Sequence, residues 1–396
     1  MSTGVTVPRG FRAAAVAAGL KPDRLDLALV VADRPCAAAG VFTANLAQAA
    51  PVVVSREHLR GGRARAVVIN AGCANAGTGA AGLADARETA VVAGLALGCP
   101  VEEVVVASTG VIGVRLPMEK VRAGIVEATA RLSTGGGADA AQAIMTTDTR
   151  PKEVAVEFRV GNATAVVGGM AKGAGMIAPS LATMLALFTT DAAVEASLLR
   201  RALREAVGGS LNRITVDGDT STNDCAVVLA SGACPGAAIG GEGPGFDAFR
   251  RAIADAAGQL ARMLVRDGEG VTRVAEVRVE GARTEAEADR IARTVAESLL
   301  VKTALHGGDP NWGRILAAVG RAGVPLDADR ISIWIGDVPV AEGGAACDYE
   351  ETLAAAAMRT DPVRLRIRLG EGEASAWIWT SDLSHGYVDI NAHYRS

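Results

Sequence analysis

Residues 168–191 read GGMAKGAGMIAPSLATMLALFTTD, a glycine-rich stretch followed by a mostly apolar one. A buried hairpin that turns at its glycines would account for this pattern. A phosphate-binding loop would need Gly-x4-Gly-Lys followed by Ser or Thr, whereas Lys172 precedes Gly173 and Gly175 and no Ser or Thr follows it directly. Taken alone, the segment leaves a structural hairpin and a functional loop open as alternatives.

The composition around this segment is that of a large globular protein. The length of 396 residues favours two large lobes over one small domain. Hydrophobic residues make up 49% and aromatic residues only 3%, so the core is expected to consist mainly of Ala, Val, Leu and Ile. The net charge of −4, with no Lys/Arg stripe, argues against nucleic acid and anionic membrane as partners.

Several classes of protein can be set aside from local patterns. No apolar run reaches the roughly 18 residues of a membrane span, and the short apolar stretch 13–20 does not resemble a signal peptide. We therefore expect a soluble, cytoplasmic protein. Six scattered cysteines indicate reduced thiols. The four histidines form no His/Cys cluster, and Asp217, Asp219 and Asp224 lack the glycine and the distal glutamate of a calcium loop, so no metal site is predicted.

Short β-branched runs alternate with Ala-rich helical runs along the chain. Apolar residues at helical spacing predict a helix over 249–264 that stops at Asp267-Gly268, and Thr284 with Glu287 predicts the start of another. This pattern alone does not distinguish α/β from α+β. The predicted strands are 27–32, 66–70, 103–107, 154–158, 165–167, 274–279, 331–335, 363–367 and 387–390.

A second glycine-rich motif, GTGAAG at 77–82, matches Gly-x-Gly-x-x-Gly. The dinucleotide-binding fingerprint needs its first glycine almost directly after a strand. Here six residues separate the motif from the end of the predicted strand 66–70, which argues against a dinucleotide site.

The segment 172–185 resembles the signature Lys-Gly-x-Gly-Met-Ile-x-Pro-x-x-Ala-Thr-Met-Leu of the ornithine acetyltransferase family, the bifunctional glutamate N-acetyltransferases of arginine biosynthesis. The resemblance is collinear over nearly the whole chain. It implies the family's α/β (mixed α+β) layered sandwich, with sheets flanked by helices and an autoprocessed threonine nucleophile. Further matching segments are PRGF at 8–11, VFT at 41–43, ASTGVIG at 107–113, IMTTDT at 144–149, DGDTSTND at 217–224, DGEG at 267–270, HGGDPNWGR at 306–314 and DINAHY at 389–394.

The resemblance implies that the chain cuts itself between Ala182 and Thr183. The products would be an α chain, residues 1–182, and a β chain, residues 183–396, assembled as two α and two β chains. The freed amine of Thr183 has a reference pKa of about 8, so it is partly neutral and can serve as base for its own hydroxyl. Thr183 would thus be the nucleophile.

Acyl transfer also needs donors for the developing oxyanion. By resemblance these are the Thr109 hydroxyl and the Gly110 N–H, which follow the predicted strand 103–107; an ordinary strand-ending turn is the structural alternative there. The family's substrates are N-acetylornithine and glutamate. No cofactor is required, and acetyl-CoA is a second donor in bifunctional members. The substrate-binding residues carried over by position are Thr146, Lys172, Thr183, Glu269, Asn391 and Ser396.

Some of these assignments remain open between neighbours or classes. Lys172 can pair a carboxylate and Glu269 an ammonium, whereas Thr147 competes with the adjacent Thr146 for the substrate contact. The segment 306–314 either shapes the pocket or an interface, or is a structural loop. An autoprocessed amidase or aminopeptidase that uses water as acceptor, and a non-catalytic relative, are the alternative functions.

Overall fold

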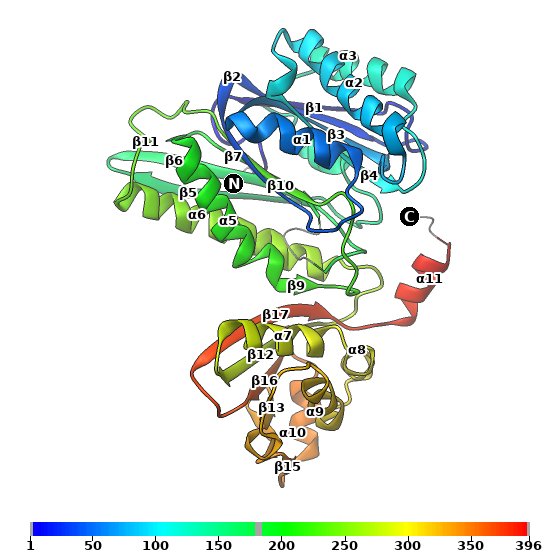
Figure 1. Cartoon of the computed structure of the whole chain (residues 1–396), viewed down its shortest axis with the longest axis vertical. Helices are drawn as coiled ribbons and strands as arrows, with labels where there is room; N and C mark the ends of the chain where they lie inside the picture. The colour runs from blue at the N-terminus through cyan, green and yellow to red at the C-terminus, as the bar shows by residue number, and fades with distance from the viewer. Residues whose placement is uncertain (1–2, 179–183, 394–396) are drawn as a thin grey trace. The chain divides into compact units, whose positions relative to one another are not determined.

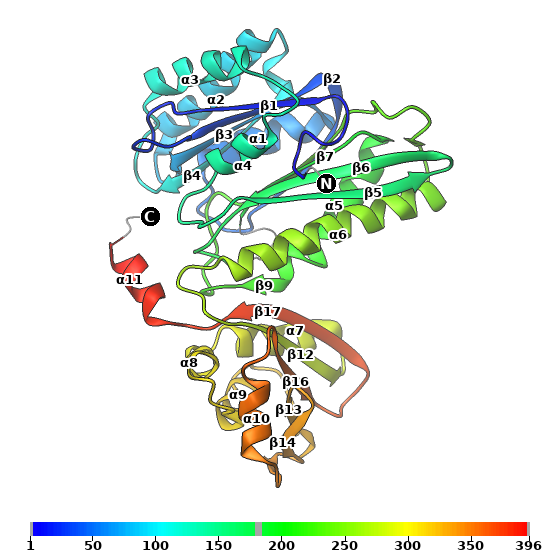
Figure 2. The same cartoon turned by 180° about the vertical axis from the view of Figure 1, so that it is seen from behind.

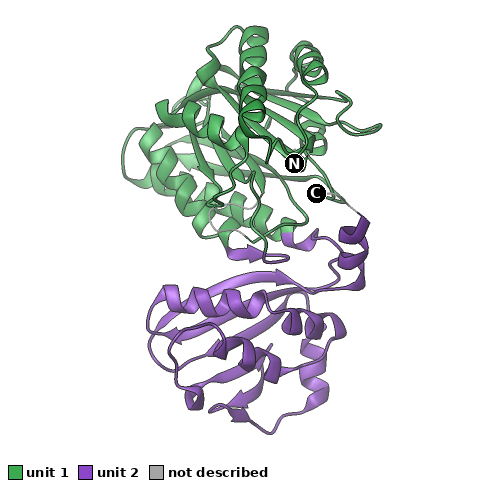
Figure 3. Ribbon diagram, turned by 45° about the vertical axis from the view of Figure 1, so that its right-hand side comes forward, with its two compact units in different colours: residues 1–212, 219–264, 395–396 green, residues 213–218, 265–394 purple. Residues whose placement is uncertain are grey.

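A computed structural model describes residues 3–178 and 184–393, which form two compact units (Figure 3). Of these residues, unit 1 contains 3–178, 184–212 and 219–264, and unit 2 contains 213–218 and 265–393. No helix within the described ranges has both the length and the apolar character needed to cross a bilayer.

Unit 1 is built on an eight-stranded sheet with the order β4-β3-β2-β10-β7-β6-β5, in which β1 also pairs with β2. The long β2 pairs with β1 through residues 27–32 and with β10 through residues 37–42. It pairs with β3 on both sides of a register shift between Val31 and Cys36. Its strands are β1 (Phe11–Val16), β2 (Leu27–Phe42), β3 (Arg63–Cys73), β4 (Val104–Val111), β5 (Lys152–Val160), β6 (Ala163–Lys172), β7 (Leu185–Thr190) and β10 (Cys225–Ala230).

This sheet forms two layers that pack against each other, with most of the helices outside and residues 140–143 packed between the layers (Figures 1 and 2). Val30, Ile69, Val105, Leu187 and Val227 belong to the buried cluster that joins the layers. A second cluster packs the first layer against α1 (Ala50–His58), α2 (Gly79–Leu97) and α3 (Met118–Ala130). The remaining elements are α4 (Gly137–Ala143), the two-stranded pair β8 (Ala193–Val194) and β11 (Ala238–Ile239), and the helices α5 (Ala196–Gly208) and α6 (Pro244–Arg266) beside the second layer.

Unit 2 contains a seven-stranded sheet with the order β15-β14-β13-β16-β12-β17-β9. A single buried cluster joins the sheet to α7 and α9, and it consists almost entirely of Ala, Val, Leu and Ile, as the composition predicts. The elements are β9 (Ile214–Thr215), β12 (Val274–Ala282), α7 (Glu285–Ala296), α8 (Leu299–Gly307), α9 (Trp312–Gly320), β13 (Ser332–Ile335), β14 (Val338–Glu342), β15 (Ala345–Ala346), α10 (Glu351–Ala357), β16 (Val363–Arg368), β17 (Ala374–Ser381) and α11 (His385–His393).

The structure confirms the mixed α/β layered fold and most predicted elements. The helix predicted over 249–264 lies within α6 and ends directly before Asp267, and Thr284 Oγ1 accepts a hydrogen bond from Glu287 N at 3.2 Å as the cap of α7. The strand predicted over 387–390 is wrong, because these residues belong to α11. A run of four residues is too short for its periodicity to separate strand from helix, and α11 buries none of its side chains.

Candidate active site

The end of β4 carries Thr109 and Gly110 at an irregular place in the sheet. β3 and β4 run parallel, and the register shifts so that Cys73 lies opposite both Thr109 and Val111. Gly110 has a φ of +123°, and a Cβ there would lie 2.4 Å from the carbonyl carbon of Gly72. Only glycine fits at this position, and the irregular pairing changes the direction in which the strand end presents its groups.

We expect Gly110→Ala to lower both stability and activity. The backbone conformation alone costs on the order of 1–3 kcal/mol for a residue with a Cβ, and the close contact with Gly72 adds to it. If the Gly110 N–H is an oxyanion donor, moving it should lower kcat by about 10²–10³-fold. Thermal unfolding and an acetyl-transfer assay measure the two effects. The control is Gly240→Ala, where a Cβ would meet no atom within 4 Å; equal losses in both variants would contradict the prediction.

Lys172, the last residue of β6, joins two of the predicted site residues. Its ammonium is buried, and it donates hydrogen bonds to Thr109 Oγ1 at 3.1 Å and to Thr146 Oγ1 at 2.8 Å. Because both hydroxyl oxygens accept from the ammonium, each hydroxyl keeps its own proton as a donor. The cluster therefore combines one cation with two hydroxyl donors beside the Gly110 backbone.

The buried carboxylate of Asp148 forms hydrogen bonds with residues next to this cluster. Asp148 Oδ1 accepts hydrogen bonds from Lys152 Nζ at 2.6 Å and Gly173 N at 2.7 Å, and Oδ2 accepts one from Thr146 N at 3.0 Å. Burial alone would raise the pKa of Asp148, but the attraction of Lys172 and Lys152, together with these hydrogen bonds, lowers it to about 2. The ionised Asp148 thus fixes the residues on either side of the Lys172 side chain.

A second lysine reaches the same region from the loop between β1 and β2. Lys21 Nζ donates to Ala143 O at 3.1 Å and Met145 O at 2.8 Å, directly before Thr146. The buried Asp26 carboxylate holds this loop by accepting hydrogen bonds from four consecutive backbone N–H groups, those of residues 18–21. Burial lowers the pKa of Lys21 to about 8, and the positive charge of Lys172 acts in the same direction.

Polar side chains from three elements lie beneath the end of β4. Asn223 Nδ2 donates to Ser108 O at 2.8 Å and to Ala74 O at 2.6 Å, and Ser108 Oγ donates to Asn70 Oδ1 at 2.6 Å. The next residue, Asp224, is buried, and its Oδ2 finds no hydrogen-bond partner in the described part of the chain. Burial raises the pKa of Asp224 well above its usual range, which favours a protonated carboxyl group.

Glu269 and Asn391, the two predicted site residues of unit 2, lie in contact. Asn391 Nδ2 donates a hydrogen bond to Glu269 Oε2 at 2.8 Å, and the Glu269 side chain is buried. Gly270 has a φ of +66°, and a Cβ there would lie 2.2 Å from Tyr387 N. The loop that carries Glu269 therefore packs tightly against the start of α11.

The structure thus groups the predicted residues within each unit. Thr109, Gly110, Thr146 and Lys172 come together in unit 1, and it is the Thr146 hydroxyl that accepts the hydrogen bond from Lys172. Ala182, Thr183 and Ser396 lie outside the described residues. The sequence did not single out Lys21, Asp26 and Lys152, because they carry no motif of their own. It placed Asp148 in a family segment without giving it a role.

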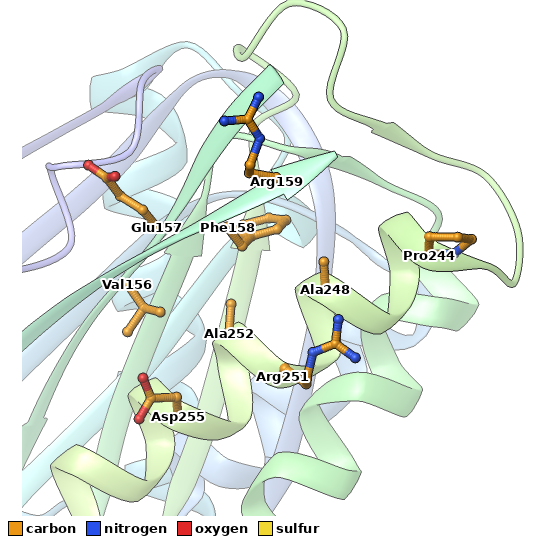
Figure 4. A pocket seen from close by; sticks show the side chains of 9 residues that line it. All are labelled: Val156, Glu157, Phe158, Arg159, Pro244, Ala248, Arg251, Ala252 and Asp255. Atoms are coloured by element: carbon orange, nitrogen blue, oxygen red, sulfur yellow. The ribbon is translucent and has the colours of Figure 1, made fainter. Parts of the chain in front are cut away.

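A hollow elsewhere in unit 1 contains none of these residues. It measures about 530 Å³ and lies between β5 and α6 (Figure 4). Phe158 turns towards α6, whereas Glu157 and Arg159 project from the opposite face of β5. None of its lining residues belongs to β4 or β6, so it is a surface feature separate from the cluster around Lys172.

The chain resembles known proteins along nearly its whole length. The model of the ArgJ family matches residues 12–396. The arginine biosynthesis bifunctional protein ArgJ of Symbiobacterium thermophilum is 49% identical over 100% of this chain and 99% of that protein. The protein of the same name from Dehalococcoides mccartyi is 46% identical over 99% of this chain and 97% of its own length. The crystal structure of the ArgJ protein from Bacillus halodurans is 40% identical, with a TM-score of 0.51, and the match covers 52% of this chain and 98% of that one.

This chain thus combines a layered α/β fold with a buried lysine and two threonine hydroxyls at a glycine-containing strand end, and the relatives named above are proteins of one biosynthetic pathway. The chain belongs to the ArgJ family, whose members named above are bifunctional proteins of arginine biosynthesis. This confirms the resemblance to ornithine acetyltransferases that the sequence motifs indicated.

Proposed function

We propose that this protein transfers the acetyl group of N2-acetyl-L-ornithine to L-glutamate through an acetyl ester on Thr183. The observation that carries the proposal is the Lys172 ammonium, which donates to both Thr109 and Thr146 beside the Gly110 backbone. Such a cluster offers the kind of positive charge and hydroxyl protons that stabilise an acyl-transfer oxyanion. The membership of the chain in the ArgJ family supports the same reaction.

Each half-reaction moves one acetyl group and one proton. The Thr183 amine takes the proton of its own hydroxyl, and Oγ attacks the acetyl carbonyl carbon of acetylornithine. The Thr109 hydroxyl and the Gly110 N–H stabilise the oxyanion, the C–N bond breaks, and the ornithine amine leaves with the proton. The amine of glutamate then attacks the ester carbonyl and releases Thr183 as a free hydroxyl.

Substrate recognition in this proposal uses both clusters of residues. Lys172 and Thr146 offer a cation and a hydroxyl to a carboxylate, and the ordered Thr146 hydroxyl favours it over Thr147 as the contact. Glu269, held by Asn391, offers a carboxylate to the δ-ammonium of ornithine. Ser396 completes the proposed set, and the reaction would take place in the cytoplasm.

The nucleophile requires cleavage between Ala182 and Thr183, and two observations support this step. The cut would fall between β6 and β7, which are antiparallel neighbours paired from Lys172 with Leu185 to Val167 with Thr190, so the fragments would remain joined by hydrogen bonds. The Bacillus halodurans chain, almost fully covered by 52% of this one, is about half as long, as a cleaved fragment would be. We propose two α and two β chains for the mature enzyme.

The acceptor decides between acetyl transfer and hydrolysis. We expect purified protein given acetylornithine and glutamate to form ornithine and N-acetylglutamate in equal amounts, with parallel double-reciprocal plots because the acetyl group resides on the enzyme between the two substrates. Chromatography of the products measures both. Acetate formation without N-acetylglutamate would identify an amidase instead. Replacing acetylornithine by acetyl-CoA tests the second donor in the same assay.

A further inference from the structure

Asp382, directly after β17, binds the segment that follows Glu269. Its Oδ1 accepts hydrogen bonds from Thr272 N at 2.9 Å and Arg273 N at 3.0 Å, and its Oδ2 accepts one from Thr272 Oγ1 at 2.5 Å. In return, Asp382 N donates to Arg273 O at 3.0 Å. This buried carboxylate therefore fixes both the backbone and a side chain three and four residues beyond Glu269.

The same two segments are joined again closer to Glu269. Ser384 Oγ donates a hydrogen bond to Gly270 O, and the close approach of Gly270 to Tyr387 N leaves no room for a side chain. Together with the bond from Asn391 to Glu269, these contacts join residues 269–273 to residues 382–391 at three places. Asp382 makes the largest number of the bonds between them.

Helix α8 holds Asp382 from the other side. His306 Nδ1 lies 2.8 Å from Asp382 Oδ2, and its side chain is 37% exposed. One turn earlier, the buried Lys302 donates hydrogen bonds to Ser381 O and, at 3.2 Å, to Thr380 Oγ1. Leu383 N donates to Lys302 O at 3.2 Å, so α8 forms hydrogen bonds with the residues directly before and after Asp382.

These contacts keep Asp382 ionised. Burial would raise the pKa of Asp382, but the hydrogen bonds from Thr272, Arg273 and His306 outweigh it and lower the pKa. An ionised acceptor forms stronger hydrogen bonds than a neutral one. The segment after Glu269 is thus held by charge-assisted bonds rather than by ordinary loop contacts.

We propose that Asp382, braced by His306, is a positioning residue that holds the Glu269 carboxylate for the δ-ammonium of the acetyl donor. Glu269 stands between Gly268 and Gly270, which restrict the backbone least of all residues, so its position depends on the contacts around it. This role gives a function to the first residue of the segment 306–314. The proposal rests on the proposed acetylornithine substrate, but its structural half can be tested without any substrate.

The kinetic test compares two acetyl donors that differ only at the δ position. N-acetyl-L-norvaline has the same carbon chain as N2-acetyl-L-ornithine and lacks the δ-amine. We expect Asp382→Asn and His306→Gln to lower kcat/KM for acetylornithine about tenfold or more, mainly through KM, because a misplaced carboxylate loses its bond to the ammonium. The value for acetylnorvaline should change less than about twofold, so that the preference between the donors falls.

Two controls sharpen the comparison. Asp329→Asn makes the same chemical change at an exposed residue of unit 2 and should leave both donors unaffected. In a Glu269→Gln background, Asp382→Asn should cause no further loss of preference, because the carboxylate that it positions is gone. Equal losses for both donors, or an additive double variant, would overturn the proposal. His306→Gln, at a partly exposed position, keeps the test usable if Asp382→Asn does not fold.

The substrate-independent test is amide hydrogen exchange of residues 269–273. We expect faster exchange in Asp382→Asn and His306→Gln than in wild type and in Asp329→Asn, because the bonds to Thr272 N and Arg273 N are weakened. Unchanged protection would overturn the positioning role. If the wild type transfers no acetyl group from acetylornithine while exchange responds as expected, the proposed substrate fails and the structural role of Asp382 stands.

Discussion

Thr183→Ala should yield one intact, inactive chain of 40.2 kDa, whereas the wild type should yield fragments of 182 and 396 − 182 = 214 residues. The substitution removes only a hydroxyl and a methyl group. If that hydroxyl attacks the Ala182 carbonyl in the precursor and the acetyl carbonyl in the mature enzyme, its loss should stop both reactions. Mass spectrometry under denaturing conditions and the acetyl-transfer assay measure the two outcomes.

Two further variants make this result specific to Thr183. Thr183→Ser keeps a hydroxyl and should still be cleaved, whereas Thr164→Ala, at an exposed position of β6, should behave as wild type. Cleavage of Thr183→Ala at the same bond would remove Thr183 from the processing step. An uncleaved wild type that still transfers acetyl groups would remove the need for processing.

Asp148→Asn should destabilise the protein by about 3–5 kcal/mol, the usual cost of removing one partner of a buried ion pair. The side chains of Lys152 and Asp148 are 1% and 0% exposed, and their Nζ and Oδ1 atoms lie 2.6 Å apart. The carboxylate also lowers the energy of Lys172 by its charge and holds Thr146 N and Gly173 N. Activity should therefore fall together with the free energy of unfolding, measured by urea denaturation.

A double variant that removes both charges distinguishes two causes of the lost stability: an unpaired buried lysine and the loss of packing around Asp148. Asp148→Asn combined with Lys152→Met removes both members of the pair and should recover part of the lost stability. The control is Asp33→Asn, since Asp33 pairs with Arg12 at 3.1 Å on the surface and should contribute no more than about 1 kcal/mol. A cost for Asp148→Asn as small as that of the control would contradict the role of a buried pair.

The ionisation of Asp148 should make the free energy of unfolding depend on pH. Its pKa in the folded protein is about 2, below the ordinary value of 3.8, so the folded state favours the ionised form. The stabilisation, about 2 kcal/mol, is therefore fully present above pH ~4 and is lost as the pH falls towards 2. The difference between wild type and Asp148→Asn should shrink over this window. A difference that does not change between pH 5 and pH 2.5 would argue against the low pKa.

The sequence predicted the elements of the fold better than the contacts of the site. Long periodic segments such as 249–264 and the cap at Thr284 are local, so their patterns determine them. The run 387–390 was wrongly predicted to be a strand, because four residues are too few to distinguish a strand from a helix, and it lies in α11. Thr109, Lys172 and Glu269 came from family motifs, whereas Lys21 reaches Met145 across 124 positions of sequence, a distance that no local pattern spans.

The strand order of unit 1 has a consequence for how a cleaved enzyme could arise at all. Read across the sheet β4-β3-β2-β10-β7-β6-β5, only β10 and β7 come from residues after 182, and they lie between strands that come from residues before it. The strands of the two products would thus alternate in one sheet, and neither product alone would contain all of its strands. We therefore expect the polypeptide to fold first and to be cut afterwards, rather than two finished fragments to dock. Each mature α chain would then keep for its lifetime the β chain with which it was synthesised.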